Sequence, residues 1–286
     1  MKKIVISGST GFVGTHLSGF LSQHGYTVDR LNRDDLNLSD IDLSERLNDT
    51  AAVINLAGAP ILHRWTALYK EELYTSRIKT TQKLANAIRL TTSKPEVFIS
   101  TSAVGIYKDK TRNTERAAQY DSGYLAKICK DWEASALTTL KFTRTVIFRL
   151  GVVMSSEGGA LKSILPIFKM GLGGPVSNGQ QGFPWIHIDD LLKAYLFVIE
   201  HPETEGIFNL TAPEIITNSQ FTKTLAAIVN RPAFIPVPNF TLKMMYGQGA
   251  VALTEGAFVE PFRLNESGFE FQYPKLEDAL KQIVKD

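Results

Sequence analysis

Apolar residues along this chain form short extended runs that alternate with longer stretches of helical spacing. Lys3 to Ser7 is a β-branched run, Phe12 to Gln23 repeats apolar residues at helical spacing, and Thr27 to Leu31 is a second extended run. Strands that alternate with helices in this way predict an α/β protein built on a doubly wound parallel sheet. Further strands are predicted near Leu36 to Leu38 and at Ala52 to Ala57, Val97 to Thr101 and Thr145 to Val153, and further helices at Trp65 to Arg89 and Gly123 to Leu140.

Two charged residues, Asp29 and Arg30, interrupt the second extended run. Parallel strands that are covered on both faces are usually apolar throughout. The charges therefore predict an edge-like position for the strand from Thr27 to Leu31.

The pattern changes after Met154. Glycine-rich stretches bracket a helical segment from Leu161 to Met170, and a helix from Asp189 to Glu200 with a strand from Gly206 to Leu210 resumes the alternation. A last helix is predicted from Lys275 to Val284. We therefore predict a core formed by residues 1–155 and completed by residues 184–211. Residues 156–183 and 212–286 are predicted to form a smaller mixed α/β lobe over the substrate.

Composition narrows the class of protein. The chain has 286 residues, of which 44% are hydrophobic and 21% charged, with a formal charge of +2; these proportions exclude disordered, collagen-like and coiled-coil proteins. No block of like charge favours binding to nucleic acid or to a membrane surface. Cys129 is the single cysteine, and the histidines lack paired metal-ligand spacing, so we predict no disulfide and no metal site. No signal peptide or spanning segment is apparent, which predicts a cytoplasmic protein. The oligomeric state is not indicated.

A glycine-rich turn separates the first strand from the first helix. It reads Gly8-Ser9-Thr10-Gly11-Phe12-Val13-Gly14. Glycines at this spacing allow a tight turn, a close approach of the backbone to a pyrophosphate, and close packing of the helix on the strand. The helix N-terminus also offers unpaired N–H groups to phosphate. In this position the turn predicts nucleotide binding, although glycine also occurs in such turns for steric reasons alone.

The end of the second strand bears on the choice between NAD and NADP. An acidic residue there usually binds the ribose hydroxyls of NAD, but this chain has Asn32 and Arg33. A guanidinium is planar and permanently charged, which suits a 2′-phosphate. We therefore predict NADP(H). The alternative is a solvent-facing Arg33, with Asp34 and Asp35 close enough to pair with it or to bind a ribose.

Together with the glycine turn, several further motifs resemble those of the extended and atypical short-chain dehydrogenases/reductases. More narrowly, they resemble the epimerase-family NAD(P)-binding proteins that carry a small dedicated C-terminal domain. The resemblance runs from residue 1 to about 285 and implies a Rossmann-type sheet. The motifs are Asn55 to Gly58, Ser76 to Ile78, Ser100 to Tyr107, Trp132 to Ala134, Arg149 to Val153, Gly171 to Pro175, Trp185 to Asp190, Thr211 to Pro213, Pro236 to Pro238 and Ser267 to Phe269.

The resemblance implies that NADP(H) lies across the strand ends, with its pyrophosphate on the glycine turn and Val153 beside the nicotinamide. Two assignments have structural alternatives: Arg77 and Glu72 are also consistent with a surface pair on one helix, and Leu56 to Gly58 with the end of a buried strand. The implied cofactor-binding residues are Gly8, Ser9, Thr10, Gly11, Phe12, Val13, Gly14, Asn32, Arg33, Asp40, Leu56, Ala57, Gly58, Glu72, Arg77 and Val153.

The catalytic pattern of this group is incomplete. Active members pair a Ser or Thr after a strand with a Tyr-x-x-x-Lys helix, whose lysine lowers the pKa of the tyrosine. Ser102 matches the serine, but Leu125 and Cys129 occupy the positions of the tyrosine and lysine. Tyr124 and Lys127 are out of register, so we do not expect them to form an acid–base pair. The candidate catalytic residues are Ser102, Tyr107 and Tyr124.

Three residues in or next to the lobe are candidate substrate contacts: Lys162 and Trp185 by position alone, and His187 as either structural or substrate-positioning. Two functions fit these observations. One is an NADP-dependent enzyme that oxidises, reduces or epimerises a small polar substrate, for example a nucleoside-diphosphate sugar. The alternative is a non-catalytic NADP-binding sensor or regulatory protein.

Overall fold

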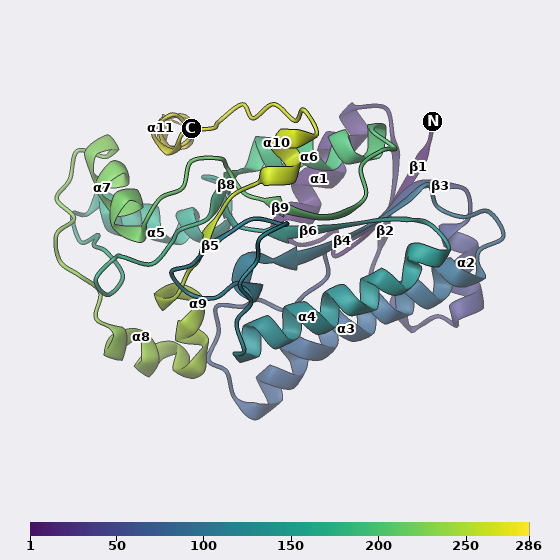
Figure 1. Cartoon of the computed structure of the whole chain (residues 1–286), viewed down its shortest axis with the longest axis horizontal. Coiled ribbons are helices and arrows are strands. Elements are labelled where there is room, and N and C mark those ends of the chain that lie inside the picture. The colour runs from purple at the N-terminus through teal and green to yellow at the C-terminus, as the bar shows by residue number, and fades with distance from the viewer. Residues whose placement is uncertain (286) are drawn as a thin grey trace.

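The computed structural model describes residues 1–285 of the chain. Within them the central feature is a six-stranded sheet in the order β2-β1-β3-β4-β6-β9, in which neighbouring strands run parallel (Figure 1). The predicted doubly wound sheet is therefore confirmed. The strands are β1 (Lys3–Ser7), β2 (Thr27–Leu31), β3 (Thr50–Asn55), β4 (Val97–Ala103), β6 (Arg144–Leu150) and β9 (Gly206–Leu210).

Helices cover both faces of this sheet because its strands are apolar on both faces. In β1, Ile4 and Ile6 belong to the apolar cluster that includes helices α1 and α6, whereas Val5 belongs to the cluster on the other face, with α2, α3 and α4. This alternation follows the two-residue period of a strand. The helices are α1 (Phe12–Gln23), α2 (Asp40–Leu47), α3 (Ala67–Leu90), α4 (Tyr124–Leu137) and α6 (Ile188–Glu200).

The strand β2 lies at the edge of the sheet, as its charged residues predict. Asp29 forms an ion pair with Arg46 of α2 at 2.5 Å. The prediction of a strand near Leu36 to Leu38 is wrong, because a short 3₁₀ helix, Asp35–Asn37, occupies this segment. The Asn32 side chain accepts the backbone N–H groups of residues 34 and 35 and so closes the chain into a turn.

The smaller lobe has its own apolar cluster. The pair β7 (Val152–Met154) and β8 (Trp185–His187) contributes Met154 and Trp185 to it, while Val153 and Ile186 face the cluster of the main sheet. Because these two strands serve both clusters, the predicted boundary between core and lobe stays a prediction. The other elements of this region are α5 (Gly159–Lys169), α7 (Asn218–Ile228), α8 (Asn239–Tyr246), α9 (Val251–Thr254), α10 (Phe262–Glu266), α11 (Leu276–Lys285) and the pair β5 (Arg112–Asn113) and β10 (Phe258–Val259).

None of the helices between residues 1 and 285 combines the length and the apolar character needed to cross a membrane.

Candidate functional site

The glycine turn joins β1 to α1, and two of its glycines are required by packing inside the protein. Gly8 has a φ of +79°, and a Cβ atom there would lie 2.7 Å from the backbone of Leu56 and Ala57. A Cβ atom on Gly14 would lie 2.3 Å from the carbonyl oxygen of Gly8. Steric demands inside the fold therefore explain both glycines without any ligand.

Gly11 is different. The nearest atom to a Cβ placed there is the Gly8 carbonyl oxygen at 3.4 Å, so the protein itself has room for a side chain. Gly11 is exposed and is the N-cap residue of α1, but no side chain caps this helix end. The first N–H groups of a helix have no partner within the helix. The turn therefore keeps a bare, electropositive helix end accessible, which suits a phosphate group.

The residues after β3 lie beside this turn. Leu56 N donates to the Ser7 carbonyl oxygen at 2.9 Å, which places Leu56 to Gly58 next to Gly8. From β1 the chain passes first to β2 on one side and then to β3 on the other, so the strand order reverses here. A crevice at such a reversal is the usual ligand site of an open α/β sheet.

Arg77 supports this edge from helix α3. Its guanidinium donates to the carbonyl oxygens of Ala59 at 2.9 Å and Leu73 at 3.1 Å, and lies 3.0 Å from where a Cβ of Gly58 would be. Burial lowers the pKa of Arg77. The alternative of a surface pair with Glu72 is not formed, because Glu72 is exposed and the guanidinium is directed to backbone carbonyls.

Arg33 follows β2 and is exposed. Asp35 cannot pair with it, since its carboxylate contacts Arg46 and also accepts the backbone N–H of Asn32 at 2.7 Å. Among residues 1–285, Arg33 makes no ion pair. Asp40, by contrast, is paired with Lys83 at 2.7 Å. The guanidinium of Arg33 is therefore available to an external anion.

Sequence reasoning missed one contact at this site. A Cβ on Gly158 would lie 2.1 Å from the ring of Phe12, so the loop before α5 packs directly on the first turn of α1. His16 of α1 contacts Glu157 of the same loop at 3.2 Å. Val153 lies at the base of this loop and is buried. The glycine pair at 158 and 159 was the available signal, but it indicates only a tight turn and does not show that the turn packs on Phe12.

A buried polar network occupies the carboxyl ends of β4 and β6. Ser102 Oγ donates to Glu133 Oε1 at 2.8 Å, and Ser102 is only 2% exposed. Glu133 also receives Arg149 Nε at 2.8 Å and Nη2 at 2.7 Å, which is a bidentate pair. Burial opposes the charge of Arg149, but the hydrogen bonds and charge of Glu133 outweigh it and raise the pKa of Arg149. The hydroxyl hydrogen of Ser102 is thus held by a structural carboxylate.

Tyr107 extends the network. Its hydroxyl donates to Asn209 Oδ1 at 2.6 Å and accepts from Arg149 Nη1 at 2.8 Å. Burial raises the pKa of Tyr107 to about 12, although the Arg149 charge and both hydrogen bonds act in the opposite direction. Tyr107 is therefore a neutral hydrogen-bonding group at physiological pH.

Known proteins identify the family to which these features belong. The profile of the NAD dependent epimerase/dehydratase family matches residues 4–211, and a domain of unknown function, DUF1731, matches residues 237–283. The chain belongs to the NAD dependent epimerase/dehydratase family. The predicted resemblance to short-chain dehydrogenases/reductases with a C-terminal domain of their own is confirmed.

Relatives match nearly the whole chain. The epimerase family protein SDR39U1 of Mus musculus is 35% identical over 297 residues, covering 99% of each chain. Its chloroplastic homologue from Arabidopsis thaliana is 35% identical and covers 99% of this chain and 86% of its own. The structure of human SDR39U1 (isoform 2) with NADPH has a TM-score of 0.93 at 33% identity, with 99% of each chain covered. A nucleoside-diphosphate sugar epimerase from Corynebacterium glutamicum has a TM-score of 0.80 at 27% identity, and the match covers 99% of this chain and 58% of that one.

The chain departs from the active members of the family on helix α4. Leu125 packs near Gly105, and Cys129 is buried, with its pKa raised to about 11 by burial and by the Glu133 charge. Tyr124 donates instead to the Lys70 carbonyl oxygen at 2.6 Å. The structure does not bring Tyr124 together with Lys127, which pairs with Asp131 at 2.6 Å. The helix face that usually carries the acid–base pair is therefore apolar in this member.

Two of the three predicted substrate contacts are interior residues, which corrects the prediction. Trp185 is 0% exposed within the apolar cluster of the lobe. His187 is 1% exposed; its Nδ1 accepts the backbone N–H of Asp189 and caps α6, and its Nε2 contacts Gln282 at 2.8 Å. Neither side chain can contact a substrate, because both are buried by packing inside the protein. Lys162 is exposed on α5.

The raised pKa of Tyr107 leads to a prediction about stability at high pH. Its pKa rises from 10.0 to about 12, so between these values the unfolded chain releases a proton that the folded protein keeps. The free energy of unfolding should therefore fall as pH rises through this window. Urea unfolding at pH 8 and pH 10.5 should show a smaller fall for Tyr107→Phe than for the wild type. Equal falls in both proteins would contradict the assignment.

Proposed function

We propose that this protein binds NADP(H) at the carboxyl ends of β1, β2 and β3. In this proposal it uses the cofactor to oxidise, reduce or epimerise a small polar substrate, such as a nucleoside-diphosphate sugar. The observation that carries the proposal is Gly11, where the protein has room for a side chain and instead leaves the end of α1 bare. The relative with NADPH, at 33% identity, gives independent support.

The residues present fit this cofactor. The turn from Gly8 to Gly14 would bind the pyrophosphate through backbone N–H groups, and the exposed guanidinium of Arg33 would bind the 2′-phosphate. Arg77 holds the backbone of Gly58 and Ala59 that would line the middle of the cofactor. When bound, NADP(H) supplies the capacity for hydride transfer.

The chain's own groups then have limited roles. Ser102 and Tyr107 are held by Glu133, Arg149 and Asn209 in a fixed, fully hydrogen-bonded arrangement. Such an arrangement orients groups at the strand ends, but burial outweighs the effect of Arg149 and Asn209 and keeps the pKa of Tyr107 raised. The predictions for Ser102, Tyr107 and Tyr124 as catalytic residues, for a cytoplasmic location, and against nucleic-acid or membrane partners stay predictions.

A non-catalytic NADP(H)-binding sensor is the second candidate, and two observations favour it. The positions of the family's tyrosine and lysine hold Leu125 and Cys129. In addition, the lobe exposes several large apolar side chains, which a partner protein would cover in this function. These side chains, with their exposed fractions, are Met170 (65%), Leu172 (61%), Phe234 (77%), Ile235 (57%), Phe240 (68%), Met244 (68%) and Met245 (56%).

Arg33→Ala tests the 2′-phosphate assignment. The variant should weaken NADPH binding by roughly tenfold or more, because a charge-assisted hydrogen bond is lost, and should leave NADH binding unchanged. Fluorescence titration with each cofactor measures both dissociation constants. Arg89→Ala, another exposed arginine at the far end of α3, is the matched control. Equal losses for NADPH and NADH would overturn the assignment of Arg33.

Titration of the wild type with NADPH, followed by an absorbance assay with possible substrates, separates the two candidate functions. Both require NADPH binding. Only the enzyme should then change the absorbance of the nicotinamide when small polar carbonyl and hydroxyl compounds are added. Failure to bind either cofactor would overturn both.

A further inference from the structure

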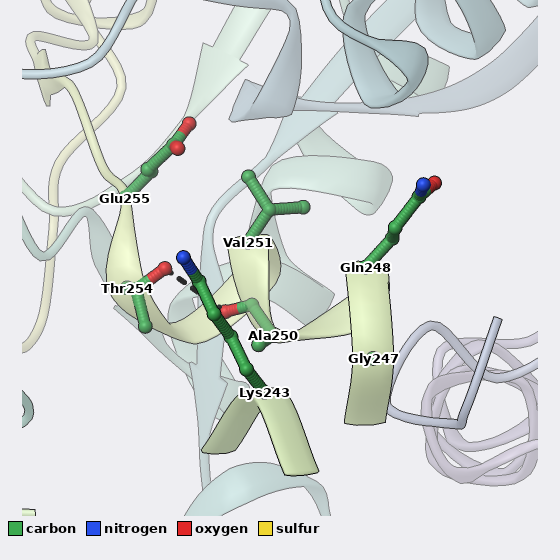
Figure 2. A pocket seen from close by; sticks show the side chains of 7 residues that line it. All are labelled: Lys243, Gly247, Gln248, Ala250, Val251, Thr254 and Glu255. Carbon is green, nitrogen blue, oxygen red and sulfur yellow. Dashed lines mark hydrogen bonds between the residues drawn. The ribbon is translucent and has the colours of Figure 1, made fainter. Parts of the chain in front are cut away.

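A surface hollow of about 440 Å³ lies on the C-terminal part of the chain, between α8, the 3₁₀ turn that follows it, and α9. None of the sequence motifs discussed above includes it. Figure 2 shows Gln248, Val251 and Glu255 directed to the same side. The lining residues are Lys243, Gly247, Gln248, Ala250, Val251, Thr254 and Glu255.

Loops from the main sheet hold this hollow in place. Arg64, in the loop after β3, donates from Nη1 to the Met244 carbonyl oxygen at 2.9 Å. On the other side, Gly256 N donates to Asp109 Oδ1 at 2.8 Å, in the loop after β4. Both loops follow carboxyl ends of strands. Residues next to the lining, Met244 and Gly256, therefore tie the hollow to loops at the edge of the sheet that carries the candidate cofactor site.

The floor of the hollow contacts the same region. Val251 packs against the buried cluster of Trp65, Leu73, Ile78, Ile128 and Trp132, and Ala59 and Leu125 pack against the same cluster. The floor of the hollow therefore shares one apolar cluster with the residue after Gly58 and with the apolar face of α4.

Three polar side chains around the hollow lack partners. In the part of the chain that the structure describes, Lys243 Nζ, the Gln248 amide and the Glu255 carboxylate make no hydrogen bond and no ion pair. Thr254 Oγ1 donates to the Ala250 carbonyl oxygen at 3.2 Å. A cation, an amide and a carboxylate therefore surround a small apolar floor, and each is available to a ligand. Burial, with the charges of Asp109 and Asp121, raises the pKa of Glu255, while Lys110 and Lys243 act in the opposite direction.

We propose that this hollow binds the substrate of the NADP(H)-dependent reaction, and that the substrate is a small molecule with one anionic group and neighbouring hydroxyl or amino groups. Lys243 binds the anionic group, Glu255 accepts hydrogen bonds from the donors, and Gln248 can bind either kind of group. The volume is within the range of small-molecule sites. This inference rests on the proposed function and specifies its substrate class.

The test uses the full-length protein saturated with NADPH. Gluconate and glycerol 3-phosphate are the anionic probes, and sorbitol is a neutral probe with the carbon chain of gluconate. Binding is followed by amide chemical shifts of residues 243–256. Both anions should shift these signals, and the affinity for sorbitol should be lower than that for gluconate by roughly tenfold or more. Lys243→Gln should weaken both anions by a similar factor and leave NADPH affinity unchanged.

Lys223→Gln is the matched control, because Lys223 is an exposed lysine of the same lobe on α7. It should bind the anions as the wild type does. Two results would show that the hollow is not the substrate site and would leave the proposed function intact. One is NADPH binding without any anion binding, and the other is anion binding that Lys243→Gln does not weaken. Absence of NADPH binding would overturn the proposed function itself.

Discussion

Gly11→Asp should abolish NADPH binding, with a rise in Kd of roughly a hundredfold or more, while the protein stays folded. A Cβ on Gly11 meets its nearest atom only at 3.4 Å, so the fold accepts a side chain. Aspartate is also a favourable N-cap residue and can bind the free N–H groups of α1. The same carboxylate would stand where the pyrophosphate is expected, and two negative charges about 4 Å apart repel strongly near a protein surface.

Calorimetric titration with NADPH measures the affinity, and thermal unfolding without ligand measures the stability of Gly11→Asp. Gly19→Asp is the matched control, because it lies on the same helix with nothing within 4 Å of its Cβ position. This control should bind NADPH as the wild type does. Unchanged affinity in Gly11→Asp would show that the glycine turn is not the phosphate site, and the proposed location of the cofactor would then be wrong although NADPH binds.

The elements that the sequence predicts best are those with a clear local period. The helix Phe12–Gln23 and the strands Thr27–Leu31 and Gly206–Leu210 have their predicted bounds. The failure at Leu36 to Leu38 has a physical cause. The Asn32 side-chain oxygen accepts hydrogen bonds from the backbone N–H groups of residues 34 and 35 and closes a turn just before this segment, and no hydrophobic period indicates these bonds.

The same distinction applies to the site. The glycine turn is local in sequence, so its chemistry could be predicted from spacing alone. The carboxylate of Glu133 and the guanidinium of Arg149 lie 16 residues apart on a helix and a strand, and only packing of α4 on the sheet brings them together. Ser102, a catalytic candidate by resemblance to the family, is brought to them for the same reason. Burial of Trp185 was likewise outside the reach of motif reasoning, because its position in the lobe does not reveal which way the ring faces.

Glu133→Ala should lower the free energy of unfolding by about 3–5 kcal/mol, the range for removing one partner of a buried ion pair. Arg149 is 2% exposed, so its charge would remain in the interior without its bidentate partner. Ser102 would also lose its acceptor. Tyr107 would remain the partner of Arg149 Nη1, but a neutral hydroxyl does not balance the charge. Urea unfolding at neutral pH measures the loss.

Asp131→Ala is the control for this result, because the half-buried Asp131 of the same helix pairs with the exposed Lys127 and accepts a hydrogen bond from Tyr74. Its loss should be below about 1 kcal/mol. The double variant Glu133→Ala, Arg149→Met should lose less stability than the sum of the two single variants, since it removes the orphaned charge. If Glu133→Ala costs no more than Asp131→Ala, the pair does not determine the stability of the strand ends.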